Sequence, residues 1–454
     1  MTYGVASIGD LIEQGFAHIQ TGPFGSQLHS YDYVPSGVPV VPTEAIRERR
    51  IDRNVCPQIT AEKASELARH RLLAGDILFA RRGVQATGHI GVVRNPEEGF
   101  LCGTGAIRLR ISKGNGTVCA EYLSHLLADP ASIAWFKFHA IGATMPNLNE
   151  GIIRNFPLHL PNYSYQRSVA IFLSALDDKI ELNRRMNETL EAMGQAIFRD
   201  WFVDFGPVRR KMAGATDPAA IMGGLTPDPT RAAELAALFP NALSDDNLPL
   251  GWSEKSIGEL VDIAGGSTPS TAEESLWQPA EHRWATPKDL SNMSDLALFE
   301  TGRRISSAGL AKITSGLLPV GTVLLSSRAP IGYLAVAQAP VAINQGFIAL
   351  RPTDDFGSAY LYLWCKANME AILANANGST FQEISKKNFR PITSATPSEC
   401  SLIRAFSQIV DPMFARIVSA AAENGTLAET RDYLLPRLMS GEVRVGDAAL
   451  EIAA

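Results

Sequence analysis

The chain of 454 residues contains an internal repeat, in which short motifs of the first half return in the same order in the second half. Residues 7–11 (SIGDL) match residues 256–260 (SIGEL), and residues 105–110 (GAIRLR) match residues 346–351 (GFIALR). Further matches join residues 72–78 with 317–324, 88–90 with 332–334, 122–123 with 360–361, 142–144 with 378–380, and 155–156 with 388–389. Ordered self-similarity of this kind predicts a tandem duplication of a unit of roughly 200 residues.

Each repeat is predicted to hold an α+β domain followed by one long helix. Short β-like runs, such as residues 76–79 and 106–111, alternate with turns and with helical patches near residues 61–69 and 120–139. We therefore expect two α+β globular domains joined by two long antiparallel helices that form a coiled-coil spacer. The expected boundaries are 1–160 for the first domain, 161–205 for the first helix, 206–250 for a linker, 251–395 for the second domain, 396–441 for the second helix and 442–454 for a tail.

Both predicted helices carry apolar residues at steps of three or four, which is the spacing of a coiled coil. In the first helix these positions are Val169, Leu173, Leu176, Ile180, Asn183, Met186, Leu190, Met193, Ile197 and Trp201. In the second helix they are Leu402, Phe406, Ile409, Met413, Ile417, Ala420, Asn424, Leu427, Leu434 and Leu438. The asparagines inside these rows, together with Asn187, are typical of residues that fix helix register. The alternative is that each helix is amphipathic and packs only on its own domain.

The segment between the repeats is rich in Pro, Gly, Ala and Asp. It contains one short helical patch, at residues 231–239. This composition predicts a linker that leads the chain into the second domain, which begins near Gly251 and Trp252.

Composition excludes several classes of protein. Apolar residues make up 46% of the chain and charged residues 19%, which is a globular balance, and the apolar runs are too short for a transmembrane helix. The first residues do not resemble a secretory signal, and five widely spaced cysteines suit a reducing cytoplasm, where we expect the protein to be located. The net charge of −6 is unusual for a DNA-binding protein, because phosphate contacts favour basic surfaces.

No enzymatic motif stands out. We find no P-loop, no glycine-rich methyltransferase loop with an Asn-Pro-Pro-aromatic motif, no Gly-x-Ser-x-Gly and no paired His or Cys set for a metal. A loose Asp…Glu-x-Lys nuclease pattern stays open, although no candidate occupies matched positions of both repeats. We expect no catalytic residue and no metal in this chain.

Two related domains on a stiff spacer could bind two separated half-sites, as a symmetric dimer of DNA-binding modules does. The repeats agree at glycines and core positions but differ in loops, as residues 18–33 and 263–278 show. Different loops on one scaffold suit two different target sequences. The alternative is a scaffold protein whose two domains bind other proteins, which the acidic net charge favours slightly.

At this point the whole chain resembles the specificity subunit of type I restriction-modification systems. The motifs that carry the resemblance are residues 20–28 (QTGPFGSQL), 75–78 (GDIL), 142–148 (GATMPNL), 176–183 (LDDKIELN), 198–205 (FRDWFVDF), 248–252 (LPLGW) and 435–442 (LPRLMSGE). The first half lacks the Pro-x-Gly-Trp entry of the second, and the linker is long. The resemblance implies a target-recognition domain in each repeat, one for each part of a bipartite, asymmetric DNA site. It also implies a non-catalytic chain that binds double-stranded DNA, two methyltransferase subunits and restriction subunits, with S-adenosylmethionine, ATP and magnesium on those partners.

Loops at matched positions supply the candidate DNA contacts. Glycine allows close approach of the backbone, hydroxyl groups suit phosphates, and Arg, Asn or Gln can pair with base edges. An ordinary loop, a solvated arginine or a structural turn is the alternative at each position. The candidates are Thr21, Gly22, Phe24, Ser26, Gln27, Arg81, Arg82, Thr144, Asn147, Ser267, Thr268, Ser327, Arg328, Ser379 and Thr380.

Apolar residues at the ends of the two helices are the candidate partner contacts. An aromatic row at helical spacing is usually core, so packing on the second helix or domain is the alternative to binding a methyltransferase subunit. The candidates are Phe198, Trp201, Phe202, Phe205, Leu434 and Leu438.

Overall fold

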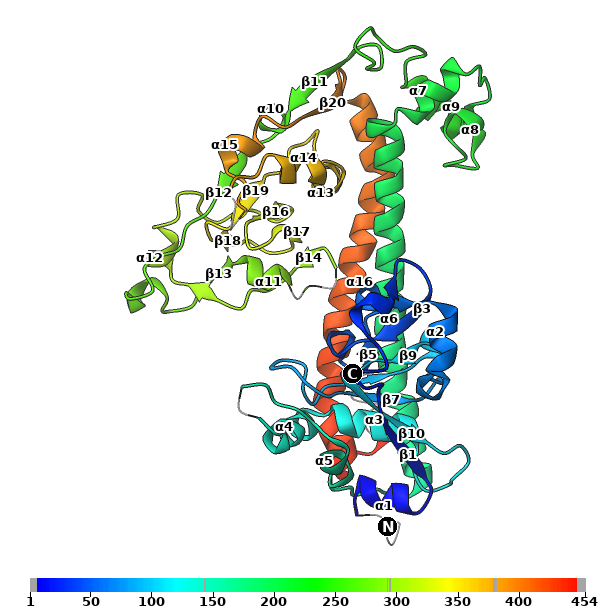
Figure 1. Ribbon diagram of the computed structural model, residues 1–454. Helices are drawn as coiled ribbons and strands as arrows, with labels where there is room; N and C mark the ends of the chain where they lie inside the picture. Colours follow the sequence, from blue (N-terminus) through cyan, green and yellow to red (C-terminus); the bar gives the residue numbers. More distant parts are fainter. Residues whose placement is uncertain (1–5, 143, 292, 294, 379–381, 447–454) are drawn as a thin grey trace. The chain divides into compact units, whose positions relative to one another are not determined.

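The computed structural model describes residues 6–142, 144–291, 293, 295–378 and 382–446. The chain divides into two compact units, which we call unit 1 (residues 1–179 and 426–454) and unit 2 (residues 180–425). Each unit combines a mixed α+β part with portions of two long helices, α6 (Tyr163–Phe198) and α16 (Ser401–Ser440) (Figure 1). The predicted tandem α+β fold is therefore confirmed.

Unit 1 is built on a four-stranded antiparallel sheet of order β1-β10-β7-β8. Beside it lies a small sheet of order β2-β6-β3-β9, in which β3 and β9 are parallel. The strands are β1 (Ala17–Thr21), β2 (Tyr33–Val34), β3 (Val38–Val41), β4 (Ile46–Arg47), β5 (Arg50–Ile51), β6 (Gln58–Ile59), β7 (Ile77–Ala80), β8 (Ile90–Val92), β9 (Leu101–Cys102) and β10 (Ala106–Ile111). The helices are α1 (Ile8–Glu13), α2 (Ala61–Glu66), α3 (Ala120–Ala128), α4 (Pro130–His139) and α5 (Glu150–Arg154).

Unit 2 repeats this topology. Its five-stranded sheet has the order β12-β19-β16-β17-β14, and a second sheet of order β15-β13-β18 again contains one parallel pair, β13 with β18. The strands are β11 (Trp252–Ser256), β12 (Ile263–Gly265), β13 (His282–Ala285), β14 (Ala297–Leu298), β15 (Arg304–Ile305), β16 (Val323–Ser327), β17 (Ile331–Ala337), β18 (Ala342–Ile343), β19 (Phe347–Leu350) and β20 (Thr393–Pro397). The helices are α10 (Ile257–Leu260), α11 (Pro287–Ser291), α12 (Ser307–Leu310), α13 (Ser358–Ala367), α14 (Met369–Ala374) and α15 (Lys386–Phe389).

The central strand of each main sheet is apolar on both faces. In unit 1, Ile77 and Phe79 of β7 pack in one core cluster and Leu78 and Ala80 in another. In unit 2, Leu324 of β16 faces one cluster while the residues on either side of it face another. Because successive side chains of a strand point to opposite faces, such strands lack the apolar-polar alternation of a half-exposed strand.

Each repeat starts with the same helix cap. Ser7 caps α1 in a capping box with Asp10, and Ser256 forms a capping box with Glu259 at the start of α10. The motif matched between residues 7–11 and 256–260 is therefore a helix start, conserved between the repeats as local structure.

Helices α6 and α16 pack against each other in antiparallel orientation within each unit. In unit 1, the Tyr165 hydroxyl donates to the Leu438 carbonyl over 2.9 Å. In unit 2, Asn183 Nδ2 donates to Asn424 Oδ1 over 3.0 Å. The residue numbers of α6 therefore rise along the pair while those of α16 fall, which confirms the predicted antiparallel orientation. Among the described residues, no helix is long and apolar enough to cross a membrane.

Nearly all the predicted coiled-coil positions are buried or half-buried, including Asn183, Asn187 and Asn424. The exception is Met193, which is 46% exposed. Gly194 takes the inward position and lies against Leu363 and Phe414 of unit 2. The prediction for Met193 is wrong because a pattern of apolar letters does not recognise a glycine as a close-packing residue.

Residues 206–250 differ from the predicted linker. They contain three helices, α7 (Gly206–Met212), α8 (Pro218–Ile221) and α9 (Pro229–Ala237). Helix α9 confirms the helical patch predicted at residues 231–239, whereas α7 and α8 were not predicted. Val208, Ile221, Leu235 and Phe239 belong to the main core cluster of unit 2. The Pro and Asp residues that suggested a linker are helix starts, since Asp217 and Asp228 each cap a helix that begins with proline.

Candidate nucleic-acid interface

The predicted DNA contacts of unit 1 gather at one end of its main sheet. Strand β1 finishes at Thr21, opposite Ile107, and β7 finishes at Ala80, opposite Ala106 at the start of β10. Because these strands are antiparallel, the loops after β1 and after β7 leave the sheet at the same end. We call this the loop end of unit 1, and it carries residues 21–28, residues 81–82 and residues 141–148.

Arg81 holds the third of these loops in place. Its carbonyl accepts a hydrogen bond from the amide of Leu148 over 2.7 Å, and its Nε donates to Asn147 Oδ1 and to the Leu148 carbonyl, both over 3.1 Å. Ile141 and Asn147 pair with each other through both backbone groups, which closes the turn between them. Arg81 therefore acts as a structural residue of the loop end.

Arg82 differs from its neighbour. Its backbone bridges to Asn147, but its side chain is exposed and makes no hydrogen bond or ion pair within the described part of the chain. An exposed guanidinium group at a loop end is available to a phosphate or to a guanine edge. Thr144 is also exposed in this turn, where Gly142 has a φ of 103°, a conformation that favours glycine.

A cleft of about 380 Å³ opens where β1 ends. Its lining includes the predicted residues Thr21, Gly22 and Phe24, and Phe24 is 63% exposed. The remaining lining residues are His18, Ile19, Gln20, Arg69, His70 and Glu150. The Gln27 side chain is engaged within unit 1, because its Oε1 accepts hydrogen bonds from the Phe24 amide over 3.1 Å and from Arg69 Nη2 over 3.2 Å. The neighbouring Ser26 is exposed.

The wall of this cleft contains a buried, neutral histidine. His70 Nε2 accepts a hydrogen bond from Arg69 Nε over 3.0 Å, and its Nδ1 is buried with no partner among the described residues. Burial, with the charges of Arg69 and Arg108, lowers the pKa of His70 to about 4. Arg108 fastens this segment to the sheet by donating to the carbonyls of Arg69 and Arg71 and to Gln20 Oε1.

The backbone at Gly22 approaches a neighbouring loop too closely for a side chain. A Cβ atom at Gly22 would collide with the carbonyl oxygen of Gly103, and a Cβ atom at Gly266 would collide with the carbonyl oxygen of Ile343. These two glycines occupy equivalent positions after β1 and β12. The sequence matched the two loops with each other, but the strand registers were needed to pair these two glycines individually.

Unit 2 builds its loop end in the same way. Strand β12 ends at Gly265, opposite Ile348, and β16 ends at Ser327 close to the start of β19. Arg328 bridges to Glu383, and Asn377 and Glu383 pair with each other through both backbone groups. The Ile384 amide donates to the Ser327 carbonyl over 3.0 Å, as Leu148 does to Arg81 in unit 1.

The predicted contacts of unit 2 differ in exposure. Thr268 is exposed and donates through Oγ1 to Oε1 of Gln345 over 2.5 Å, and Ser267 is half-buried. Ser327 is buried, so its hydroxyl offers no surface for a phosphate. Ser379 and Thr380 lie outside the described residues. Gln345 and Glu383 were not among the sequence candidates, although alignment of Glu383 with Asn147 could have identified the second.

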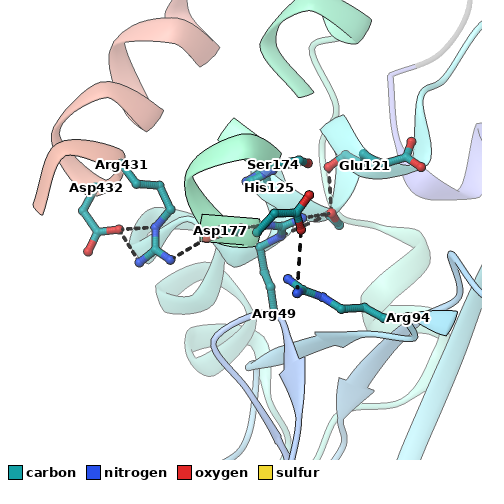
Figure 2. Close-up of polar contacts among 10 residues, drawn as sticks. Arg49, Arg94, Glu121, His125, Ser174, Asp177, Arg431 and Asp432 are labelled. Atoms are coloured by element: carbon teal, nitrogen blue, oxygen red, sulfur yellow. Dashed lines mark hydrogen bonds and ion pairs between the residues drawn. The ribbon is translucent and has the colours of Figure 1, made fainter. Parts of the chain in front are cut away.

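A buried ionic cluster in unit 1 was also not predicted (Figure 2). Arg49, in the turn between β4 and β5, forms an ion pair with Asp177 of α6 and donates to Ser124 of α3. Arg431 of α16 donates to the other Asp177 oxygen over 2.8 Å. Burial is the main cause that lowers the pKa of Arg49 to about 10, and burial also holds the pKa of His125 well below its usual value. The cluster joins the recognition part of unit 1 to both long helices.

The predicted partner contacts are core residues of their own units. Phe198, Trp201, Phe202 and Phe205 lie in the main core cluster of unit 2, where Phe198, Trp201 and Phe202 pack around Phe406. Leu434 and Leu438 are buried in unit 1. These side chains have almost no exposed surface, so the geometry gives no support to direct contact with another subunit.

Known proteins resemble this chain over most of its length. A family model described as the type I restriction modification DNA specificity domain matches residues 32–192 and 249–398, once in each repeat. The chain is 28% identical over 414 residues to the HindI specificity subunit of Haemophilus influenzae, an alignment that covers 83% of this chain and 88% of that protein. It is 37% identical over 153 residues to the MjaIX specificity subunit of Methanocaldococcus jannaschii, covering 33% of this chain and 35% of that one.

A solved structure supports the fold. The crystal structure of the type I restriction-modification S subunit from M. genitalium superposes with a TM-score of 0.52 over 95% of this chain and 94% of that chain. The two sequences are 14% identical, so this likeness concerns the fold alone.

Proposed function

Since this chain belongs to the family of type I restriction-modification DNA specificity subunits, we propose that it recognises a bipartite, asymmetric DNA site and directs methyltransferase and restriction subunits to it. Its partners would be double-stranded DNA, two methyltransferase subunits and restriction subunits. S-adenosylmethionine, ATP and magnesium would bind to those partners, because this chain supplies target choice and they supply the chemistry.

One observation carries the proposal of a two-part site. The two loop ends have the same backbone construction, with equivalent glycines at Gly22 and Gly266 and equivalent bridges at Arg82 and Arg328. The side chains mounted on that construction differ, as Phe24 and Thr268 illustrate. Equal scaffolds with unequal contacts suit recognition of two different short sequences, since base-edge contacts specify sequence while backbone contacts position the protein.

The acidic net charge of −6 is compatible with this assignment when the contacts are local. Arg69 lines the cleft of unit 1 and the exposed Arg82 lies at the same loop end. A few guanidinium groups suffice for phosphate contacts, while partner subunits add the rest of the electrostatic attraction.

Two measurements test the proposal. The chain and its cognate methyltransferase subunit should shift duplex DNA in a gel, and the methylated motif of the host genome should have two parts separated by a fixed gap. Replacement of residues 1–160 by the first domain of another family member should change one part of that motif and leave the other intact. Failure to bind any duplex at low salt would instead favour a protein-binding scaffold.

A further inference from the structure

The two loop ends carry a different side chain at one equivalent position. Asn147 in unit 1 forms backbone bridges with Arg82 and with Ile141. Glu383 in unit 2 forms the equivalent bridges with Arg328 and with Asn377. The next residue in each case donates its amide to the last residue before that arginine. A neutral amide has thus been exchanged for a carboxylate on the same backbone.

The surroundings of the two side chains differ accordingly. Asn147 Oδ1 accepts a hydrogen bond from Arg81, which is half-buried. The equivalent residue of unit 2 is the buried Ser327. Glu383 Oε2 lies 3.7 Å from Arg328 Nη1, and the two side chains are 47% and 36% exposed. At this separation the pair attracts through charge without forming a hydrogen bond. An exposed pair of this kind adds at most a small stabilisation.

The turn of unit 2 does not need this ion pair. The backbone bridges of Glu383 with Arg328 and with Asn377 are the counterparts of the bridges in unit 1, where the Arg81 side chain adds hydrogen bonds to Asn147 and Leu148. The exposed ion pair of Glu383 with Arg328 adds little to these backbone bridges, so the local fold does not require the charge of Glu383.

A carboxylate is an unusual group on a surface that faces DNA. It only accepts hydrogen bonds when ionised, so a phosphate repels it. The partners that DNA offers it are the amino groups of bases, above all N4 of cytosine, whereas arginine donates to O6 and N7 of guanine. A carboxylate and a guanidinium side by side match the two bases of one G·C pair.

Building on the proposed function, we infer that Arg328 and Glu383 together recognise a G·C base pair in the half-site bound by unit 2. Unit 1 does not offer the same contact, because Asn147 Oδ1 is engaged by Arg81 and, in the described part of the chain, no carboxylate forms an ion pair with the exposed Arg82. Glu383 is then a specificity-determining residue and one origin of the asymmetry between the half-sites.

The test selects preferred sites from a pool of randomised duplex DNA, with the whole chain bound to its cognate methyltransferase subunit. Wild type should require G·C at one position of one half-site. Glu383→Gln should lower that preference about 10- to 100-fold, since an amide accepts and donates at adenine. The other half-site should not change. Glu399→Gln removes the same charge from an exposed residue after β20 and should leave both half-sites as they are.

A second variant covers the case in which Glu383→Gln fails to fold. Arg328→Lys keeps the charge but loses the planar fork that fits guanine, so it should weaken the preference at the same position. An unchanged motif in whichever of these variants folds would overturn the inference and leave the proposed function intact. A wild-type chain that selects no two-part motif would instead overturn the proposed function.

Discussion

Arg49 and Asp177 lie 128 positions apart in the sequence and form a buried ion pair that ties a turn of the recognition domain to helix α6. Glu48 and Arg49 both have positive φ values, 50° and 57°, which are unfavourable for residues with a side chain. The contacts of the Arg49 side chain hold the turn in that conformation. Asp177 also pairs with Arg431, whose guanidinium group pairs in addition with Asp432.

The first prediction follows from this shared carboxylate. Asp177→Asn should destabilise unit 1 by about 3–5 kcal/mol, because it removes the ion-pair partner of the buried Arg49 and leaves Arg431 with Asp432 alone. Urea unfolding of the chain measures the loss of stability, and hydrogen exchange of the α3 amides in the folded chain locates it. Asp178→Asn is the matched control, since Asp178 is 74% exposed, against 5% for Asp177, and lies 3.8 Å from Arg94. The control should cost less than about 1 kcal/mol. Equal losses of unfolding free energy in the two variants would show that the buried ionic cluster does not stabilise unit 1 as proposed.

A second prediction concerns the close approach at Gly22. Gly22→Ala should destabilise unit 1 by about 1–3 kcal/mol, because the new methyl group meets the Gly103 carbonyl oxygen and backbone must move. Gly25→Ala, three residues later in the same loop, has nothing within 4 Å of its Cβ position and should change stability by less than about 0.5 kcal/mol. Thermal unfolding of both variants decides. A tolerated Gly22→Ala would contradict the assigned contact between these loops.

The sequence predicted the parts of the fold that depend on repetition and periodicity. The repeat located equivalent strands such as β7 and β16, and heptad spacing located α6 and α16. Both patterns depend on many residues that agree, so the one exposed position, Met193, did not affect the outcome.

The parts that were missed depend on single contacts between distant segments. Nothing near Arg49 in the sequence indicates that its partner is Asp177, and the short helices α7 and α8 have compositions typical of loops. At the interface, the order of the strands was needed to show that residues 21–28, 81–82 and 141–148 share one end of a sheet. Burial of Ser327 was likewise visible only once the sheet was assembled.

A third prediction tests the polar pair between the helices in unit 2. Asn183→Leu alone should cost about 1–3 kcal/mol, since it removes the partner of the buried Asn424 Oδ1. The double variant Asn183→Leu with Asn424→Leu should recover part of that loss, because the unpaired amide of Asn424 is then gone, whereas Glu423 Oε2 still loses the hydrogen bond that Asn183 Nδ2 donates over 2.7 Å. A double-mutant cycle of urea midpoints measures the coupling. A double variant less stable than both single variants would contradict this account.

A fourth prediction concerns acid stability. The folded-state pKa of His70 is about 4, below its ordinary value of 6.5, so the unfolded chain binds more protons between these values. The free energy of unfolding of unit 1 should therefore fall as the pH drops from about 6.5 to about 4. His70→Gln should flatten this part of the profile, since glutamine can accept from Arg69 but does not titrate. A wild-type slope in the His70→Gln chain would remove His70 as the cause.

The last prediction separates the two arginines at the loop ends by the salt dependence of DNA binding. Arg82 is exposed with no side-chain partner among the described residues, whereas Arg328 lies beside Glu383. Arg82→Ala should weaken binding to all duplexes and reduce the slope of log affinity against log salt by about 1, as loss of one phosphate contact does. Arg328→Ala should change this slope less, because the carboxylate already compensates its charge, but it should reduce discrimination between sequences. Titrations of labelled duplexes at several salt concentrations measure both effects, with thermal unfolding to verify that each variant folds. If affinity and slope are unchanged in both variants, neither arginine belongs to the interface, and the contacts with DNA must lie on another surface of the two units.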